Sequence, residues 1–114
     1  MKGEGEYHDY LQDMIEATDK VASFIAGLTE AQFLADDRTQ FAVVRALEIL
    51  GEASKKIPAS FKSTHGDIPW REVAGMRDKL VHDYFGVNAE VVWKTATADV
   101  PPIARALRKA IGEE

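Results

Sequence analysis

The sequence predicts an all-α protein, an antiparallel bundle of four to five helices in a single domain over residues 1–114. Apolar residues recur at three- and four-residue spacing along most of the chain, which is the period of an amphipathic helix. No segment alternates apolar and polar residues over the length of a strand, and no repeat or linker divides the 114 residues. A chain of this length can form one core, and association with a second copy would add to its stability.

End signals place the first two helices. An apolar stripe at 11–28 predicts the first helix, and Gly27 lies close to its end. Asp36 and Asp37 are suitable N-caps for a second helix that runs to Pro58.

The second half of the chain predicts two more long helices. The stretch PASFKSTHGD predicts a short helical turn and a loop, and the third helix then begins at Pro69 and ends by Gly86. Asn88 caps the fourth helix. Its apolar stripe continues past the prolines at 101–102, which favours a kink over a new helix capped by Asp99.

Composition excludes several classes of protein. Without cysteine the chain has neither a disulfide framework nor a thiolate metal site, and no His or carboxylate spacing is typical of a metal site. No apolar run approaches the ~18 residues of a membrane span, and the acidic start MKGEGEYHDY is unlike a secretory signal. We therefore expect a cytoplasmic protein without a metal.

Charge is unevenly distributed along the chain. The net charge is -5, but residues 1–37 hold nine acidic and two basic side chains, whereas 38–114 hold ten acidic and twelve basic ones. Lys55, Lys56 and Lys62 would form at most a weak basic patch. This distribution permits a nucleic-acid partner without predicting one.

The stretch MRDKLVHDYFG, residues 76–86, contains the strongest candidate site. At about 100° per residue, Arg77 lies inside the apolar arc of its helix and Tyr84 lies beside that arc. A buried arginine needs a partner or an anion, because an unpaired buried ion costs several kcal/mol. His82 lies about 140° from Arg77 on an ideal helix, so the two would not meet on one substrate atom.

Two arrangements would bring Arg77 and His82 together. The helix could end near residues 80–82 and let the imidazole swing back, or Arg77 of one subunit could meet His82 of another across a symmetric dimer. Asp78, four residues before His82, could accept a proton from the imidazole ring.

These residue types suit RNA cleavage without a metal. Histidine can act as base or acid near neutral pH, arginine can hold phosphate oxygens, and tyrosine can bind a phosphate or stack on a base. Taken alone, R-x4-H-x-Y is a short pattern, and its commoner meaning is a structural helix end.

The second helix holds a secondary candidate. Arg45, Glu48, Glu52 and Lys56 lie on one side of it. They could form a solvated ladder of ion pairs. Alternatively, Arg45 and Glu52 could lie at the rim of a cleft and orient Arg77 or His82. Both interpretations stay open.

The stretch IPWREVAGMRDKLVHDYFGVN resembles the signature of the HepT-like toxins of the HEPN superfamily, whose motif R-x4-6-H is extended in this branch to R-x4-H-x-Y. The segment TQFAVVRALEILGEASKKI, residues 39–57, resembles the family's helix with an Arg, a following Glu and Gly-Glu-Ala. The order of these blocks, the loop between them and the chain length also agree.

The resemblance implies a HEPN-like bundle with a specific activity. Such proteins are metal-independent endoribonucleases that need no cofactor and form homodimers in which two motifs line one cleft. Arg77 and His82 would be catalytic, and cleavage would leave 2′,3′-cyclic phosphate ends. Where the family often has Asn or another polar residue, Asp78 would either reduce activity or hold His82 more firmly.

The resemblance also implies a partner. HepT-like toxins are typically paired with an MNT-type nucleotidyltransferase antitoxin, which neutralises them by binding and by AMPylation of the motif tyrosine, here Tyr84. A second interpretation is a non-catalytic adaptor that binds such a nucleotidyltransferase, and the acidic charge and Asp78 favour it. A third, a small-molecule-binding bundle, would need a buried ligand pocket.

Overall fold

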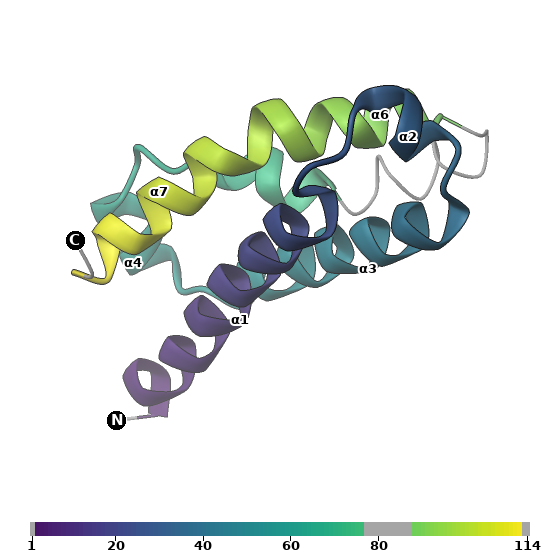
Figure 1. Cartoon of the computed structure of the whole chain (residues 1–114). Helices are drawn as coiled ribbons and strands as arrows, with labels where there is room; N and C mark the ends of the chain where they lie inside the picture. The colour runs from purple at the N-terminus through teal and green to yellow at the C-terminus, as the bar shows by residue number, and fades with distance from the viewer. Residues whose placement is uncertain (1, 77–87, 113–114) are drawn as a thin grey trace.

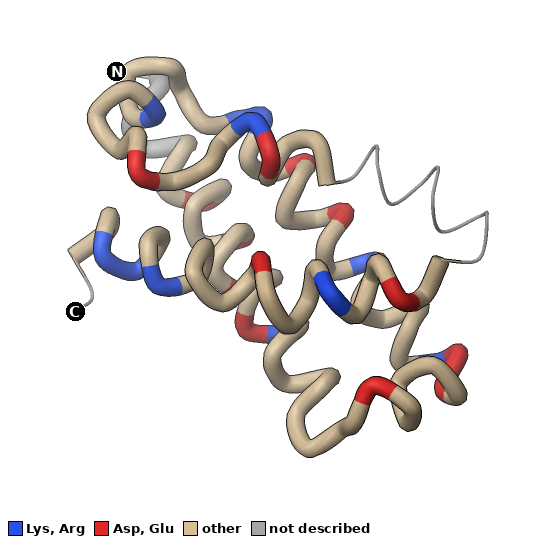
Figure 2. The backbone as a smooth tube through the Cα atoms, turned by 90° about the horizontal axis from the view of Figure 1, so that it is seen from above, with Lys and Arg blue, Asp and Glu red and all other residues tan. Residues whose placement is uncertain are grey.

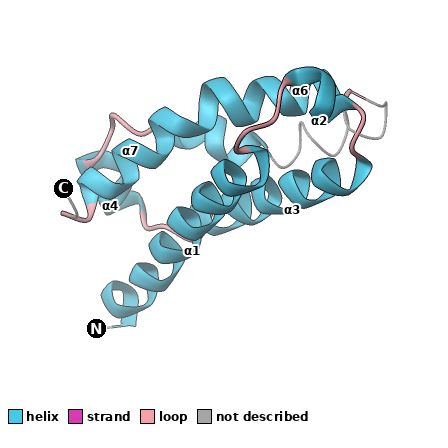
Figure 3. Ribbon diagram, viewed as in Figure 1, coloured by secondary structure: helices cyan, strands magenta, loops and turns pink. Residues whose placement is uncertain are grey.

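The computed structural model describes residues 2–76 and 88–112, which are helical apart from short connections (Figures 1 and 3). A helical segment at 70–76 lies between α4 and α6 in the chain. No strand occurs in the described ranges, so the predicted all-α class is confirmed. The labelled elements are α1 (Lys2–Ile25), α2 (Glu30–Leu34), α3 (Asp37–Ser54), α4 (Ala59–Thr64), α6 (Ala89–Lys94), the π-helix η1 (Thr95–Asp99) and α7 (Val100–Ala110).

The three long helices form the body of the bundle. Figure 1 shows α1 running in the opposite direction to both α3 and α7, as expected for an antiparallel bundle. α1 packs along α3 and α7, while α2 packs against α3 and α6. The described core has one continuous cluster of apolar side chains, whose largest fully buried members are Leu11, Met14, Val21, Phe33, Val43, Leu47, Leu50, Ile68, Val73, Val92 and Leu107.

The connection after α1 contains a helix that the sequence reasoning missed. α1 ends at Ile25, and Gly27 follows with φ of 78°, a left-handed conformation that favours glycine. α2 then starts with a capping box: the Gln32 N–H donates to the Thr29 hydroxyl at 3.2 Å, and the Thr29 N–H donates to the Gln32 side chain at 3.0 Å. Phe33 anchors this short helix in the core.

Asp36 starts α3, as predicted. Its carboxylate accepts the Thr39 N–H at 3.1 Å and the Thr39 hydroxyl at 2.6 Å. These two hydrogen bonds hold the pKa of Asp36 below its ordinary value. α3 ends at Ser54, earlier than the predicted Pro58, and hydrogen-bonded turns continue to Ile57.

The chain stays helical across the proline pair at 101–102. Asn88 caps α6, as predicted, by accepting the Val91 N–H at 3.3 Å. The Val100 N–H donates to the Thr95 carbonyl five residues back, which is the hydrogen bond of a π-turn. The wider turn accommodates prolines at the first positions of α7, where a missing N–H costs little. Asp99 makes no capping hydrogen bond, so the alternative of a new helix capped by Asp99 is not observed.

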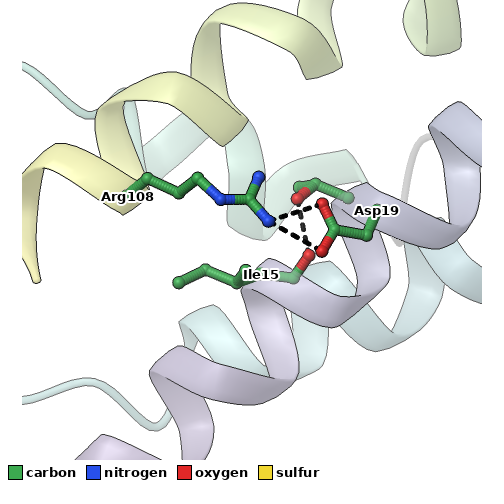
Figure 4. Close-up of polar contacts among 4 residues, drawn as sticks. Ile15, Asp19 and Arg108 are labelled. Carbon is green, nitrogen blue, oxygen red and sulfur yellow. Dashed lines mark hydrogen bonds and ion pairs between the residues drawn. The ribbon is translucent and has the colours of Figure 1, made fainter. Parts of the chain in front are cut away.

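An ion pair joins α1 to α7 (Figure 4). One Arg108 nitrogen, Nη2, donates to both carboxylate oxygens of Asp19, at 2.9 and 2.8 Å, and the Thr18 hydroxyl nearby donates to the Ile15 carbonyl at 2.7 Å. The pair borders a surface pocket of about 310 Å³ between the two helices. Of the helices in the described ranges, none has the length and apolar content that crossing a membrane requires.

Candidate functional site

The residues of the R-x4-H-x-Y motif lie outside the described residues. The roles assigned above to Arg77, Asp78, His82 and Tyr84 therefore stay predictions. The structure describes the scaffold on either side of these residues. That scaffold is the helical segment 70–76 before the motif and the Asn88 cap of α6 after it.

The segment that leads into the motif is anchored at both ends. The Pro69 carbonyl accepts the Val73 N–H at 2.9 Å, so the helix begins one residue after the predicted start. The Trp70 indole N–H donates to the His65 carbonyl at 3.0 Å. Val73 and Met76 are buried and Trp70 is half-buried against the core, which confirms the described part of the predicted apolar arc.

A surface pocket of about 430 Å³ lies beside the last described turn of this helix. Met76, Pro69 and Pro102 are among its apolar lining residues. Its polar lining consists of three exposed carboxylates, those of Asp67, Glu72 and Asp99. A phosphodiester would be repelled by this lining, so the pocket does not fit the RNA backbone.

On α3 the predicted ion-pair ladder is present in part. Arg45 Nη1 lies 3.3 Å from Glu48 Oε1, and the Arg45 side chain is 63% exposed. Such an exposed pair contributes little to stability. The Lys56 ammonium lies 5.2 Å from the ring centroid of Tyr10, and Lys56 and Glu52 both line a shallow pocket of about 140 Å³ between α1 and α3. The predicted role of Arg45 and Glu52 in orienting Arg77 or His82 involves residues outside the described ranges.

The structure brings together side chains that spacing in the sequence does not connect. Tyr7 and His8 of α1 meet Phe61 of α4 and His65, the residue at the end of α4, in one row of rings. From the sequence, the two histidines had no spacing typical of a metal site and no other predicted role. No sequence signal joins them, because the contact depends on how α4 packs against the start of α1.

Both tryptophans pack against apolar residues. Trp93 lies with its ring centroid 5.2 Å from that of Phe33, and Trp70 is packed against the core. Within 2–76 and 88–112, no three His, Asp or Glu side chains are placed to hold a metal ion. Figure 2 shows basic and acidic positions interspersed over the described chain, without one extended basic face.

Comparison with known proteins identifies relatives along most of the chain. The family model "Ribonuclease HepT-like" matches residues 14–110, a span that contains Arg77, His82 and Tyr84. A "Probable ribonuclease HepT" of Thermococcus cleftensis is 54% identical over 97 residues, which cover 85% of this chain and 88% of the relative.

Two further relatives carry RNase names. A "Putative RNase" of Methanocaldococcus jannaschii is 41% identical over 90% of this chain and 84% of its own length. A "Putative RNase" of Caldanaerobacter subterraneus is 36% identical over 92% of this chain and 94% of its own length. No solved structure matches. Because the family model and these relatives cover nearly the whole chain, the protein belongs to the HepT-like ribonuclease family of the HEPN superfamily.

Proposed function

We propose that this protein is a metal-independent endoribonuclease toxin that acts in the cytoplasm as a homodimer. The observation that carries the proposal is the match of the HepT-like ribonuclease family over residues 14–110, a span in which the R-x4-H-x-Y motif is intact. The all-α bundle and the helix that leads into the motif agree with it.

The proposed reaction is an internal transfer at one RNA phosphodiester. The ribose 2′-oxygen attacks phosphorus, the bond to the 5′-oxygen breaks, and a 2′,3′-cyclic phosphate remains. His82 either takes the proton of the 2′-hydroxyl, while water protonates the leaving 5′-oxygen, or protonates that oxygen, while water takes the 2′-hydroxyl proton. Arg77 binds the phosphate oxygens as negative charge develops on them. Tyr84 binds the phosphate or stacks on a base.

We propose that the complete site is shared between two subunits. Arg77 and His82 are five residues apart, about 140° around an ideal helix, which does not direct both side chains to one atom. A two-fold axis beside the motif would pair Arg77 of each subunit with His82 of the other. Asp78 is proposed to accept a hydrogen bond from a ring N–H of His82, and Arg45 and Glu52 to lie at the rim of this cleft.

The proposed antitoxin is an MNT-type nucleotidyltransferase. It would bind this protein and transfer AMP from ATP to Tyr84: the tyrosine oxygen attacks the α-phosphorus, pyrophosphate leaves, and the hydroxyl proton passes to a base. The added nucleotide would put bulk and negative charge into the phosphate site and thereby exclude RNA.

The first experiment compares cleavage of total RNA by the wild type and by His82→Ala in the presence of EDTA. We expect the wild type alone to cleave and to leave cyclic phosphate ends, while circular dichroism shows that both proteins are folded. Equal cleavage by the folded His82→Ala variant would refute the catalytic role of His82. No cleavage by a folded, unmodified wild-type dimer would favour the non-catalytic adaptor that binds the nucleotidyltransferase.

A second experiment tests the modification site. The wild type and Tyr84→Phe are incubated with the nucleotidyltransferase and ATP and analysed by intact-protein mass spectrometry. We expect the mass of an adenylyl group to appear on the wild type and not on Tyr84→Phe, because the phenylalanine ring has no oxygen to accept AMP. An adenylyl group on the variant would place the modification at another residue.

A further inference from the structure

We propose that the row of rings formed by α1 and α4 is an accessory binding site for single-stranded RNA, outside the R-x4-H-x-Y motif. The ring row is defined as His8, Tyr7, Phe61 and His65, in spatial order. The inference rests on the proposed ribonuclease function, since it concerns a second contact with the same class of substrate.

The ring row is continuous across two elements. The ring centroids of His8 and Tyr7 lie 5.1 Å apart with the planes nearly parallel, at 13°. The centroids of Tyr7 and Phe61 are 5.3 Å apart, and those of Phe61 and His65 are 4.1 Å apart and stacked. Figure 1 shows α4 at the end of the molecule toward which α1 extends its N-terminal half. The row therefore presents several rings on one end of the bundle.

The two ends of the ring row are imidazole rings with accessible surface. His8 is exposed and His65 is half-buried. In the part of the chain that the structure describes, neither histidine makes a ring contact beyond its inner neighbour in the row. Since nucleobases stack on any aromatic face, each terminal ring can extend the row by one base without displacing a ring.

Two lysine ammonium groups lie over aromatic rings that neighbour the ring row. Lys62 Nζ is 5.6 Å from the ring centroid of Trp70, which in turn meets Phe61 edge-on. Lys56 Nζ is 5.2 Å from the ring centroid of Tyr10, one helical turn after Tyr7. Aromatic faces for bases next to cations for phosphates are the combination used by proteins that bind single-stranded nucleic acid.

Neighbouring carboxylates limit the electrostatic attraction. Asp9 follows His8 and Asp67 lies two residues after His65, and both are exposed. They offset part of the charge of Lys56 and Lys62. Stacking should therefore supply most of the affinity, and binding should depend only weakly on salt.

The inner and outer rings of the row differ in what their removal should do. Tyr7 and Phe61 pack against the hydrophobic core, so their substitution would disturb the attachment of α4. His8 is exposed on a regular helix, so alanine there removes a stacking surface and leaves the core intact. His65 also contacts the Phe61 carbonyl through Nδ1, at 3.1 Å, so the variant at His8 gives the cleaner separation of RNA binding from packing.

The test is binding of a fluorescently labelled single-stranded RNA of about 12 nucleotides to the full-length chain, measured by anisotropy. All proteins carry His82→Ala, so that the measurement does not depend on cleavage. We expect His8→Ala and His65→Ala each to weaken binding about tenfold, and His8→Phe to bind like the parent. Lys62→Ala should reduce the slope of log affinity against log salt by about 0.7.

Lys20→Ala is the matched control, an exposed lysine of α1 about 18 Å along the helix from His8. Weaker binding by the histidine variants with unchanged binding by the control would support the site. Unchanged binding by both folded histidine variants would overturn it, even if the wild type cleaves RNA. If the histidine variants lose RNA binding and the wild type does not cleave RNA, the accessory RNA site would be supported and the proposed nuclease activity would be refuted.

Discussion

At the scale of single residues, short polar side chains cap the starts of α2, α3 and α6. Thr29, Asp36 and Asn88 each accept a backbone N–H from the third residue that follows. The first turn of a helix leaves such N–H groups without partners inside the helix, so these caps satisfy donors that would otherwise depend on water. Asp36 adds a negative charge at the positive end of the α3 dipole.

Asp36→Ala should lower the thermal unfolding midpoint at pH 7 because it removes both hydrogen bonds to Thr39. The pKa of Asp36 is lowered in the folded protein, so its stabilising effect is present above the ordinary carboxyl value of 3.8 and is lost as pH falls through the lower folded value. The difference between the variant and the wild type should thus shrink in acid.

Thermal melts at several pH values measure this difference, and Asp36→Asn is the control because asparagine caps a helix without a charge. A difference that is constant from pH 7 into strong acid would show that the ionised carboxylate is not responsible.

At the scale of elements, α2 is a five-residue helix that depends on its contacts for stability. Helices this short do not persist alone in water. α2 is held by the capping box at its start and by Phe33, which is fully buried and lies beside Trp93 of α6. The Gln40 side-chain amide also donates to the carbonyls of Phe33 and Leu34, at 2.9 and 3.2 Å. This helix is therefore fixed by tertiary contacts from α3 and α6.

Phe33→Ala should lower the free energy of unfolding by about 3–5 kcal/mol, because it leaves a cavity among α2, α3 and α6. Urea unfolding followed by tryptophan fluorescence measures the loss. Phe33→Leu is the matched control and should lose considerably less, since leucine fills most of the space. A loss below about 1 kcal/mol for Phe33→Ala would mean that α2 is not an integral part of the core.

At the scale of the whole molecule, the proposed shared site can be tested by mixing two inactive variants. In a dimer of Arg77→Ala with His82→Ala, one of the two Arg77–His82 pairs carries both substitutions and the other pair carries neither. Coexpression at equal levels should restore about one quarter of the wild-type cleavage, because about half the dimers are mixed and each has one of its two Arg77–His82 pairs intact.

The readout is the initial rate of RNA cleavage by the coexpressed proteins, with each variant expressed alone as the control. Size-exclusion chromatography with light scattering checks that dimers form. A mixture of folded dimers that stays inactive would place Arg77 and His82 of one subunit in the same site.

Regular periodicity and capping residues made the long helices predictable. The starts at Asp37 and Ala89 follow Asp36 and Asn88, whose capping role can be read from residue type and from the apolar stripe behind them. α2 and η1 were missed because their causes are not local patterns. α2 depends on burial of Phe33, and η1 depends on how the helix accommodates two consecutive prolines.

The candidate site was only partly predictable from the sequence. The residue types of the motif and the resemblance to HepT-like toxins identified the family that the comparisons show. The ring row was not predictable, since its two halves are joined only where Tyr7 of α1 contacts Phe61 of α4. Helical spacing describes neighbours within one element and carries no information about contacts between distant elements.

The π-turn at η1 sets the rotational phase between α6 and α7. Val92 lies before this turn and Ala96 within it, and both are buried in the core. The core residues after the turn are Val100, Ile103 and Leu107. The π-turn holds one residue more than an α-turn, so loss of one residue would close it to an α-turn and crowd the prolines at 101–102 against the carbonyls four residues back. Gain of one residue would rotate everything downstream by about 100°, the angle that one residue occupies on a helix. Leu107 would then leave the core and Arg108 would turn away from Asp19, so an insertion at residues 95–99 would do its damage two to three turns later. Insertions and deletions within the family should therefore avoid this stretch, although Thr97, Ala98 and Asp99 are exposed.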